Sequence, residues 1–193
     1  MFGLNGLEKL ADVKKCVPGR ISVEIARMFG VQSTDVGLLW VEEDKLIFLY
    51  PVELQSAGSI PLTSSAIAAQ SARGRRPLYF NNFPQVPHHT SFERIVLNNS
   101  RPLSEMPDPI QKIMSVPIVA SDGVLLGVIQ VCRKGMTPAM AGPDFTENDL
   151  QRLIEASRLI ATLQPELDAA KSAEYPMLHF RNNWSNGPRK ASA

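Results

Sequence analysis

Hydrophobic residues recur along the chain with two periods, one typical of helices and one of strands. Residues 4–11 and 21–29 carry apolar side chains at every third or fourth position, which places them on one face of a helix. The second helix is predicted to end at Gly30, because glycine readily adopts the left-handed conformation that follows many helices. Two N-terminal helices of this kind can cover a sheet or pair with a second copy of the chain.

Short apolar runs predict two β-hairpins. Residues 36–41 and 45–50 are rich in β-branched, aliphatic and aromatic residues and are separated by three acidic residues. Residues 113–135 contain two further apolar runs joined by Ser121-Asp122-Gly123, and Asp-Gly is a strong hairpin signal because both positions tolerate positive φ. The last run is apolar on both faces except at Gln130, so we expect one amide inside a strand with two buried faces.

The middle of the chain predicts a cap of loops and short elements. Residues 66–73 are predicted to form a short helix that Thr63-Ser64-Ser65 caps and Gly74 ends. A loop or ragged strand at residues 51–59 precedes it, and a short strand at residues 77–80 follows. Residues 81–109 are irregular apart from a helix of one or two turns, which the capping box Thr90-x-x-Glu93 opens.

The C-terminal part predicts a long helix and completes the fold class. Thr146 is the expected N-cap with Asp149 three residues on, and Pro165 interrupts or restarts the helix, which then continues to residue 175. The order of elements predicts an α+β fold: a central antiparallel sheet with N- and C-terminal helices on one face and a loop and short-helix cap on the other. We expect residues 1–20 to form a helical extension, residues 21–163 a single domain, and residues 164–193 a helix continuation and basic tail.

Composition narrows the class of protein. The chain has 193 residues, a net charge of +1 and 44% hydrophobic residues, which is ordinary for a globular domain and gives no argument for nucleic acid or membrane binding. Its two cysteines, Cys16 and Cys132, show no zinc-binding or disulfide spacing. A cytoplasmic location is therefore expected, with no cofactor and no metal.

Three sequence blocks are similar to motifs of the GAF domain family of small-molecule sensing and signalling domains. They are IPLTSSAIAAQSARGRRPLYFNN at residues 60–82, SVPIVASDGVLLGVIQVCRKG at residues 115–135 and DFTENDLQRLIEASRLIA at residues 144–161. The resemblance extends over about residues 21–163. It implies a PAS-like fold with a small-molecule pocket between the sheet and the cap.

The resemblance also implies which side chains would face a ligand. Positions that face the family's pocket are Gly37, Tyr50, Ile67, Ala68 and Ser115, and loop side chains that could close over a ligand are Phe83, His88, His89 and Phe92. For each of them, plain core packing or a solvated loop is the alternative. Alanines at positions 66 and 69 replace two glycines of the family pattern, which restricts backbone approach by a bulky ligand.

Gln130 is the most informative of these positions. It matches the strand position where some cyclic-nucleotide-binding members place an acidic residue against the purine, and an amide can both donate and accept hydrogen bonds. The alternative is that Gln130 bonds the backbone of a loop inside the cap. The resemblance further implies that Lys134 and Asp149 form a structural tie, although Arg133 and Leu150 depart from the nucleotide-binding signature.

Two surface features suggest partners. Arg73, Arg75 and Arg76 form a basic cluster that is either solvated surface or a contact for an anion or an acidic partner. Phe180 and Trp184 lie among basic residues in the tail, and aromatic residues of this kind are common interface anchors. They are candidates for binding a partner protein.

The expected function is signalling without catalysis. One enzyme group within the family reduces free methionine sulfoxide with pocket cysteines, and residues 55–109 contain none. We therefore expect an intracellular domain that binds a small molecule, with a nucleotide as one candidate, and relays binding to a partner protein through flanking helices that form a homodimer. The alternative is a ligand-free adaptor that acts by protein–protein interaction and dimerisation.

Overall fold

The computed structural model describes residues 18–85 and 108–174. The helices predicted within residues 4–11 and after Thr90, and the tail beyond residue 174, lie outside the described residues. The described elements are α2 (Pro18–Phe29), η1 (Ser33–Asp35), β1 (Val36–Glu42), β2 (Lys45–Tyr50), η2 (Val52–Ala57), β3 (Ser59–Pro61), α3 (Ile67–Gly74), β4 (Leu78–Phe80), η3 (Phe83–Gln85), β5 (Ile110–Val119), β6 (Leu125–Lys134), α4 (Glu147–Thr162) and α5 (Gln164–Glu174).

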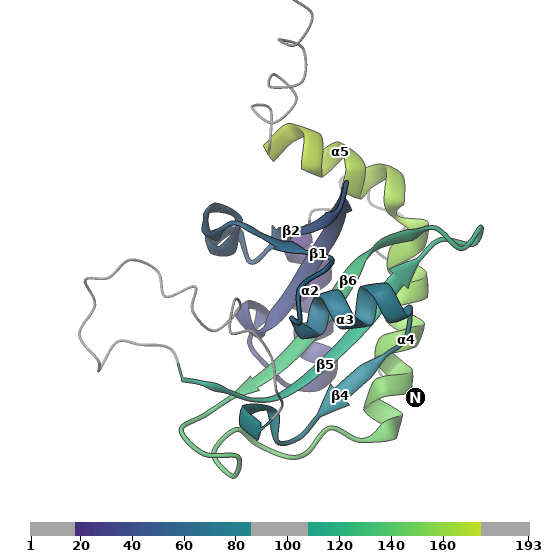
Figure 1. Ribbon diagram of the computed structural model, residues 1–193. Helices are drawn as coiled ribbons and strands as arrows, with labels where there is room; N and C mark the ends of the chain where they lie inside the picture. Colours follow the sequence, from purple (N-terminus) through teal and green to yellow (C-terminus); the bar gives the residue numbers. More distant parts are fainter. Residues whose placement is uncertain (1–17, 86–107, 175–193) are drawn as a thin grey trace, which may run out of the picture.

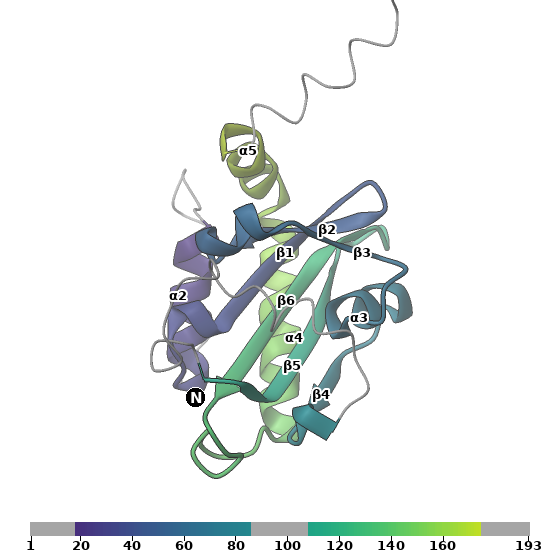
Figure 2. The same ribbon diagram turned by 60° about the vertical axis from the view of Figure 1, so that its left-hand side comes forward.

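The strands form one antiparallel sheet in the order β3-β2-β1-β6-β5-β4 (Figures 1 and 2). Both predicted hairpins are present, as β1–β2 and β5–β6. They meet at the centre of the sheet, where β1 pairs with β6. The predicted α+β fold with a central antiparallel sheet is therefore confirmed.

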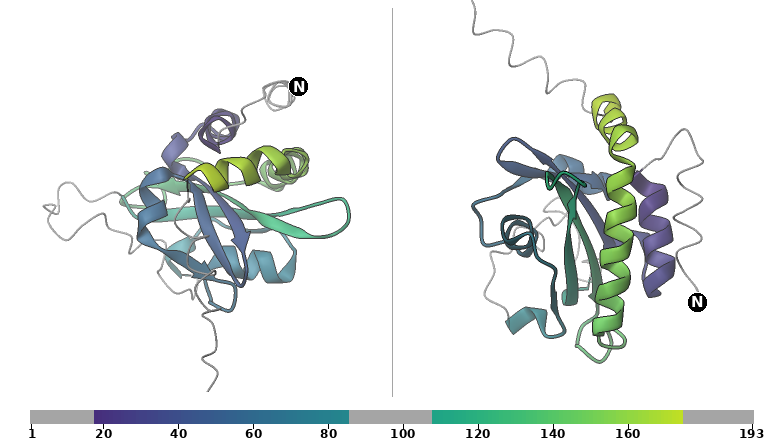
Figure 3. Two further views of the ribbon diagram at one scale, coloured as in Figure 1. Left: turned by 90° about the horizontal axis from the view of Figure 1, so that it is seen from above. Right: turned by 90° about the vertical axis from the view of Figure 1, so that its right-hand side faces the viewer.

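Helices cover both faces of the sheet (Figure 3). Helices α2 and α4 lie side by side on one face, and α3 lies on the other, as the sequence predicts. We call the apolar layer under α2 and α4 the helix-side core. It includes Ile21, Ile25 and Phe29 of α2, Leu38, Met114, Ile129 and Val131 of the strands, and Leu153 and Ile160 of α4.

The opposite face carries two smaller apolar clusters beneath α3. The first cap-side cluster comprises Leu39, Leu46, Phe48, Ile60, Ala66, Ala68, Ala69, Ala72 and Val128. The second cap-side cluster comprises Ile67, Phe83, Ile110, Ile113 and Cys132. With both faces covered, β5 and β6 are buried over most of their length, which explains their nearly continuous apolar sequence.

The ends of α2 and α4 follow the sequence prediction. Gly30 has φ +62°, and the N–H of Val31 donates to Ala26 O at 3.1 Å, which closes α2 with a left-handed glycine. At α4, Thr146 Oγ1 accepts from the N–H of Asp149, and the Asp149 carboxylate accepts from the N–H of Thr146. The predicted N-cap at Thr146 is therefore confirmed, and the two reciprocal bonds make it a capping box.

Three local predictions need correction. Helix α3 has Ala66 at its N-cap, without a side-chain cap, and runs through Gly74, so that Arg75 takes the left-handed position with φ +47°. Residues 52–57, predicted as a loop or ragged strand, form η2. In the β5–β6 turn only Gly123 has a positive φ, because the loop has three residues rather than two: Ala120 pairs with Val124, and the N–H of Gly123 donates to Ala120 O at 2.9 Å.

Helix α5 restarts after a short break, as Pro165 predicts. Leu163 and Leu167 are buried in the helix-side core, and Trp40 Nε1 donates to Asp168 Oδ1 at 2.9 Å. These contacts fix the start of α5 against the sheet. Among the described residues, no helix combines the length and the hydropathy that crossing a membrane requires.

Candidate functional site

A row of four residues crosses the sheet beneath α3. In register across β1, β6, β5 and β4 lie Gly37, Gln130, Ser115 and Leu78. Gln130 and Ser115 are 2% and 0% exposed, so their polar groups are removed from water. A buried polar group without a partner is costly, and the contacts of this row therefore decide what it can do.

Ser71 of α3 completes a polar cluster with Ser115 and Gln130. Gln130 Nε2 donates to Ser115 Oγ at 3.2 Å. Ser71 Oγ lies 3.1 Å from Ser115 O and 2.9 Å from Arg76 O, so one hydroxyl proton is shared between two carbonyls. None of the described residues donates a hydrogen bond to Gln130 Oε1. The amide therefore retains acceptor capacity in the interior of the cap face.

This polar cluster separates the two cap-side clusters. Ala68 belongs to the first cluster, and Ile67 and Phe83 belong to the second, so the three predicted pocket residues divide between the two cap-side clusters. Sequence reasoning missed Ser71. Its spacing of four residues from Ile67 on the same helix was the available signal, because residues four apart share a helix face.

Tyr50 does not belong to this face, which corrects the prediction that it faces the pocket. The β1–β2 register shifts between Leu38 and Leu39, so that Leu38 pairs with Tyr50 while Leu39 pairs with Phe48. The irregularity turns Tyr50 toward the helix side. There it packs against the helix-side core, and its hydroxyl donates to Ser33 Oγ at 3.1 Å.

The predicted tie between Lys134 and Asp149 is wrong. Lys134 Nζ lies 2.7 Å from Oδ1 of Asp35, the last residue of η1, directly before β1. The Asp149 carboxylate is engaged in the α4 capping box and lies 3.5 Å from Arg152 Nη1. Both residues are structural, but each stabilises a different junction.

The other predicted contacts divide between the surface and the part of the chain that is not described. Arg73 Nη1 donates to the carbonyls of Leu62 and Ser64, and Arg75 Nη1 donates to Gly123 O at 2.8 Å. These two arginines therefore pin α3 to neighbouring loops. Outside the described residues lie His88, His89, Phe92, Phe180 and Trp184.

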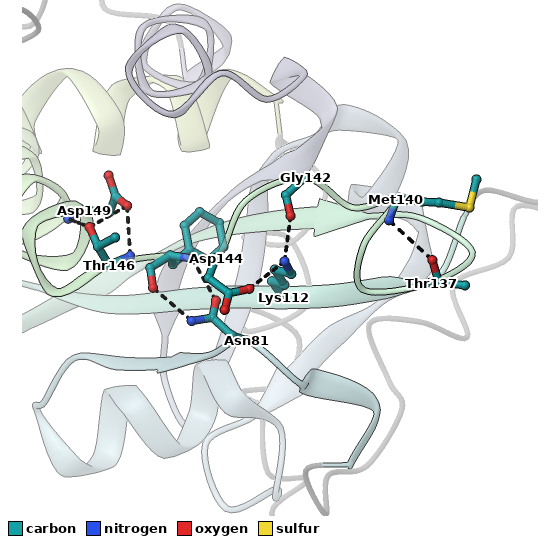
Figure 4. A network of polar contacts seen from close by, with 9 residues as sticks. Asn81, Lys112, Thr137, Met140, Gly142, Asp144, Thr146 and Asp149 are labelled. Atoms are coloured by element: carbon teal, nitrogen blue, oxygen red, sulfur yellow. Dashed lines mark hydrogen bonds and ion pairs between the residues drawn. The ribbon is translucent and has the colours of Figure 1, made fainter.

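The loop between β6 and α4 is fastened to the sheet by polar contacts (Figure 4). Lys112, only 4% exposed, places Nζ 2.6 Å from Gly142 O and 2.7 Å from Asp144 Oδ1. Asn81 exchanges two hydrogen bonds with the backbone of Phe145, at 2.8 and 2.9 Å. These groups are structural ties. Within residues 18–85 and 108–174, no three His, Cys, Asp or Glu residues gather closely enough to hold a metal ion.

Comparison with known proteins agrees with this architecture. The family model described as "GAF domain" matches residues 20–163. The chain is similar to the GAF domain of an Acinetobacter phosphoenolpyruvate-protein phosphotransferase, with a TM-score of 0.59 and 12% identity over 86% of this chain and 91% of that one. No curated protein matches the chain.

Two further solved structures show the range of proteins that share the fold. A free methionine-R-sulfoxide reductase from Neisseria meningitidis has a TM-score of 0.57 and 18% identity over 86% of each chain. A GAF domain/HD domain protein from Geobacter sulfurreducens has a TM-score of 0.51 and 13% identity over 86% of this chain and 97% of that one. At these identities the likeness shows the fold alone.

Proposed function

The chain belongs to the GAF domain family of sensory and regulatory domains, and from this premise we propose that it binds a small molecule between the sheet and α3. The observation that carries the proposal is the polar cluster of Ser71, Ser115 and Gln130, which is buried in an otherwise apolar face. The Gln130 amide can read a donor and acceptor edge such as that of a nucleobase. A nucleotide is therefore one candidate ligand.

The relay we propose runs through β6. Gln130 faces the cap, while its neighbours Ile129 and Val131 face the helix-side core. A shift of β6 on ligand binding would change how α2 and α4 pack on the sheet, because packed cores shift between discrete arrangements. We propose that these helices pass the change to a partner protein and form the contacts of a homodimer in the cytoplasm.

We propose a regulatory rather than a catalytic role. A sulfoxide reductase needs an attacking thiolate and a second thiol to resolve the intermediate. On the described part of the cap face, the thiol is that of Cys132. It is 1% exposed and lies within the second cap-side cluster. Cysteines buried in apolar surroundings are generally unreactive. The fold itself is compatible with catalysis, since the Neisseria meningitidis neighbour is an enzyme.

One observation favours a second function, that of a ligand-free adaptor. Gln130 already has a protein partner in Ser115, and bulky side chains such as Phe48 and Phe83 fill the two cap-side clusters. An adaptor of this kind would use the buried amide to fix the position of the strand rather than to read a ligand.

Native mass spectrometry of freshly purified protein, compared with a denatured sample, tests the proposal. A bound small molecule adds a non-covalent mass that denaturation removes, and the same spectrum reports the oligomeric state. Gln130→Leu should abolish the added mass, because leucine has a similar volume but cannot hydrogen-bond. It should also abolish any thermal shift that the identified ligand produces.

Gln111→Leu is the matched control. Gln111 is also a buried amide, 5% exposed, but its Nε2 donates to Gly135 O at 2.8 Å in the β6–α4 loop. This variant should lose stability to a similar extent and keep the ligand. Bare wild-type protein with no thermal shift across a nucleotide and metabolite panel would refute ligand binding and support the adaptor. Equal loss of ligand in both variants would refute the role assigned to Gln130.

A further inference from the structure

A surface pocket lies away from the cap face, where the C-terminus of α2 meets the end of β6. It has a volume of about 370 Å³ and is lined by Gly30, Val31, Gln32, Asp35, Arg133, Lys134 and Ala141. Because the α2–η1 connection, η1, β6 and the β6–α4 loop all contribute, the pocket is formed by the packed fold rather than by one loop. Its charged residues belong to none of the contacts assigned to the polar cluster.

The pocket contains one of two arginines that cap α2. Arg133 Nη2 donates to Phe29 O at 3.1 Å, and its guanidinium carbon lies 4.8 Å from the centre of the Phe145 ring. Arg152 Nη2 donates to Met28 O at 3.0 Å, and its guanidinium carbon lies 5.3 Å from the centre of the Phe29 ring. Each of the two guanidinium groups therefore caps a terminal carbonyl of α2, at the negative end of the helix dipole.

The two arginines, Arg133 and Arg152, differ in whether a carboxylate balances their charge. Arg152 Nη1 lies 3.5 Å from the carboxylate of Asp149. None of the described carboxylates forms an ion pair with Arg133. The carboxylate in the pocket, Asp35, is already paired with Lys134 at 2.7 Å and accepts the N–H of Gln32 at 3.2 Å.

The pocket therefore carries a net charge of +1, from two cations and one carboxylate. The α2 C-terminus contributes roughly half of a negative charge, shared with Arg152, and does not neutralise it. The Nε of Arg133 is in addition buried without a hydrogen-bond partner among the described residues. A bound water or ion is one of the recognised explanations of such a donor. Because Nε is covered in this structure, an anion in the pocket reaches it only if the Arg133 side chain rotates.

We propose that this pocket binds a small oxyanion, a carboxylate or a phosphate group, with the guanidinium of Arg133 as its principal contact. Arginine suits this role because its planar fork of N–H donors matches the oxygens of carboxylates and phosphates. The bound anion supplies the charge partner that none of the described residues offers to Arg133. It thereby stabilises the junction of α2 with β6.

Amide chemical shifts in a two-dimensional ¹⁵N NMR spectrum test this directly. The protein is titrated with sodium phosphate and, separately, with sodium acetate, at constant ionic strength maintained with sodium chloride. We expect saturable shifts at Gly30, Gln32 and Ala141 with at least one of the two anions, and the difference between the arms identifies the preferred oxyanion. Arg133→Gln should weaken the binding by about tenfold or more, since hydrogen bonds to charged groups are strong.

Arg152→Gln is the matched control. It removes an equivalent cap of α2 and an equivalent ring contact, but it lies outside the pocket, so the affinity should remain. If Arg133→Gln does not fold, Lys134→Gln replaces it: this variant frees the Asp35 carboxylate, whose charge should weaken anion binding. Absence of saturable shifts, equal shifts with chloride, or equal losses in Arg133→Gln and Arg152→Gln would overturn the proposal.

Discussion

The close approach of β1 to β6 gives a sharp prediction for Gly127→Ala. Gly127 lies opposite Trp40 in the sheet. A Cβ at this position would lie 2.2 Å from the carbonyl oxygen of Leu39 and 2.8 Å from Cε3 of Trp40. Both distances are far below van der Waals contact, and the nearer atom belongs to the backbone. The methyl group therefore fits only if the β1–β6 pairing itself shifts.

The size of the effect follows from two opposing terms. Overpacking a well-packed core typically costs about 1–3 kcal/mol, and a backbone clash at the centre of a sheet belongs at the upper end of that range. Alanine leaves the unfolded chain less conformational entropy than glycine does, and this stabilises the folded state by roughly 0.4–1 kcal/mol, offsetting part of the cost. We expect a net loss of about 2 kcal/mol in the free energy of unfolding, equivalent to a fall in Tm of about 4–8 °C for a chain of this size.

Urea denaturation followed by circular dichroism measures this loss, with Gly19→Ala as the control. At Gly19 in α2 an added Cβ would lie 3.5 Å from the ring of Tyr50, which is ordinary contact. Alanine also has the higher helix propensity, so this variant should be neutral or up to about 1 kcal/mol more stable. If Gly127→Ala is as stable as Gly19→Ala, the tight β1–β6 contact described above does not exist.

Two further variants test local ties. Asn81→Ala should cost about 1–3 kcal/mol by removing both hydrogen bonds to the Phe145 backbone, and the Phe145 amide should exchange its hydrogen faster while β5 amides stay protected. Unchanged exchange at Phe145 would contradict this assignment. Thr146→Ala should cost about 0.5–2 kcal/mol in urea denaturation because it removes the N-cap of α4. Thr162→Ala, at the other end of the helix, should cost less, and the reverse order would argue against the capping box.

Periodicity was sufficient to predict the layers of the fold. The family resemblance placed Gln130 and Ser115 in one pocket, and their pairing across β5 and β6 puts them on the same face of the sheet. The helical stripe of α2 predicted a helix that covers the sheet. Ser71 escaped prediction because its contact with Ser115 depends on how α3 sits over the sheet, which no local pattern encodes. The assignment of Tyr50 by resemblance failed because the shift in β1–β2 pairing beside Leu38 turns Tyr50, at the end of β2, toward the helix side.

Ion pairs were the least predictable contacts. The resemblance paired Lys134 with Asp149, yet Lys134 forms its ion pair with Asp35 of η1. The capping box already engages Asp149, and a sequence motif of this kind indicates local bonds more reliably than distant ones. The sequence likewise could not predict that Arg133 forms no ion pair with a described carboxylate. That depends on which nearby carboxylates, such as Asp35, are already paired in the folded protein.

The pairing of β1 with β6 has a consequence for how the chain acquires its structure. Val36 pairs with Val131, so the central seam of the sheet joins segments from opposite ends of the domain. Each hairpin alone is a two-stranded unit, which is marginal in water. During synthesis the β1–β2 hairpin must therefore wait, with the β1 edge unpaired, until β6 has emerged. Such non-local pairing slows folding, and the waiting edge is the point at which a nascent chain is most exposed to pairing with another copy.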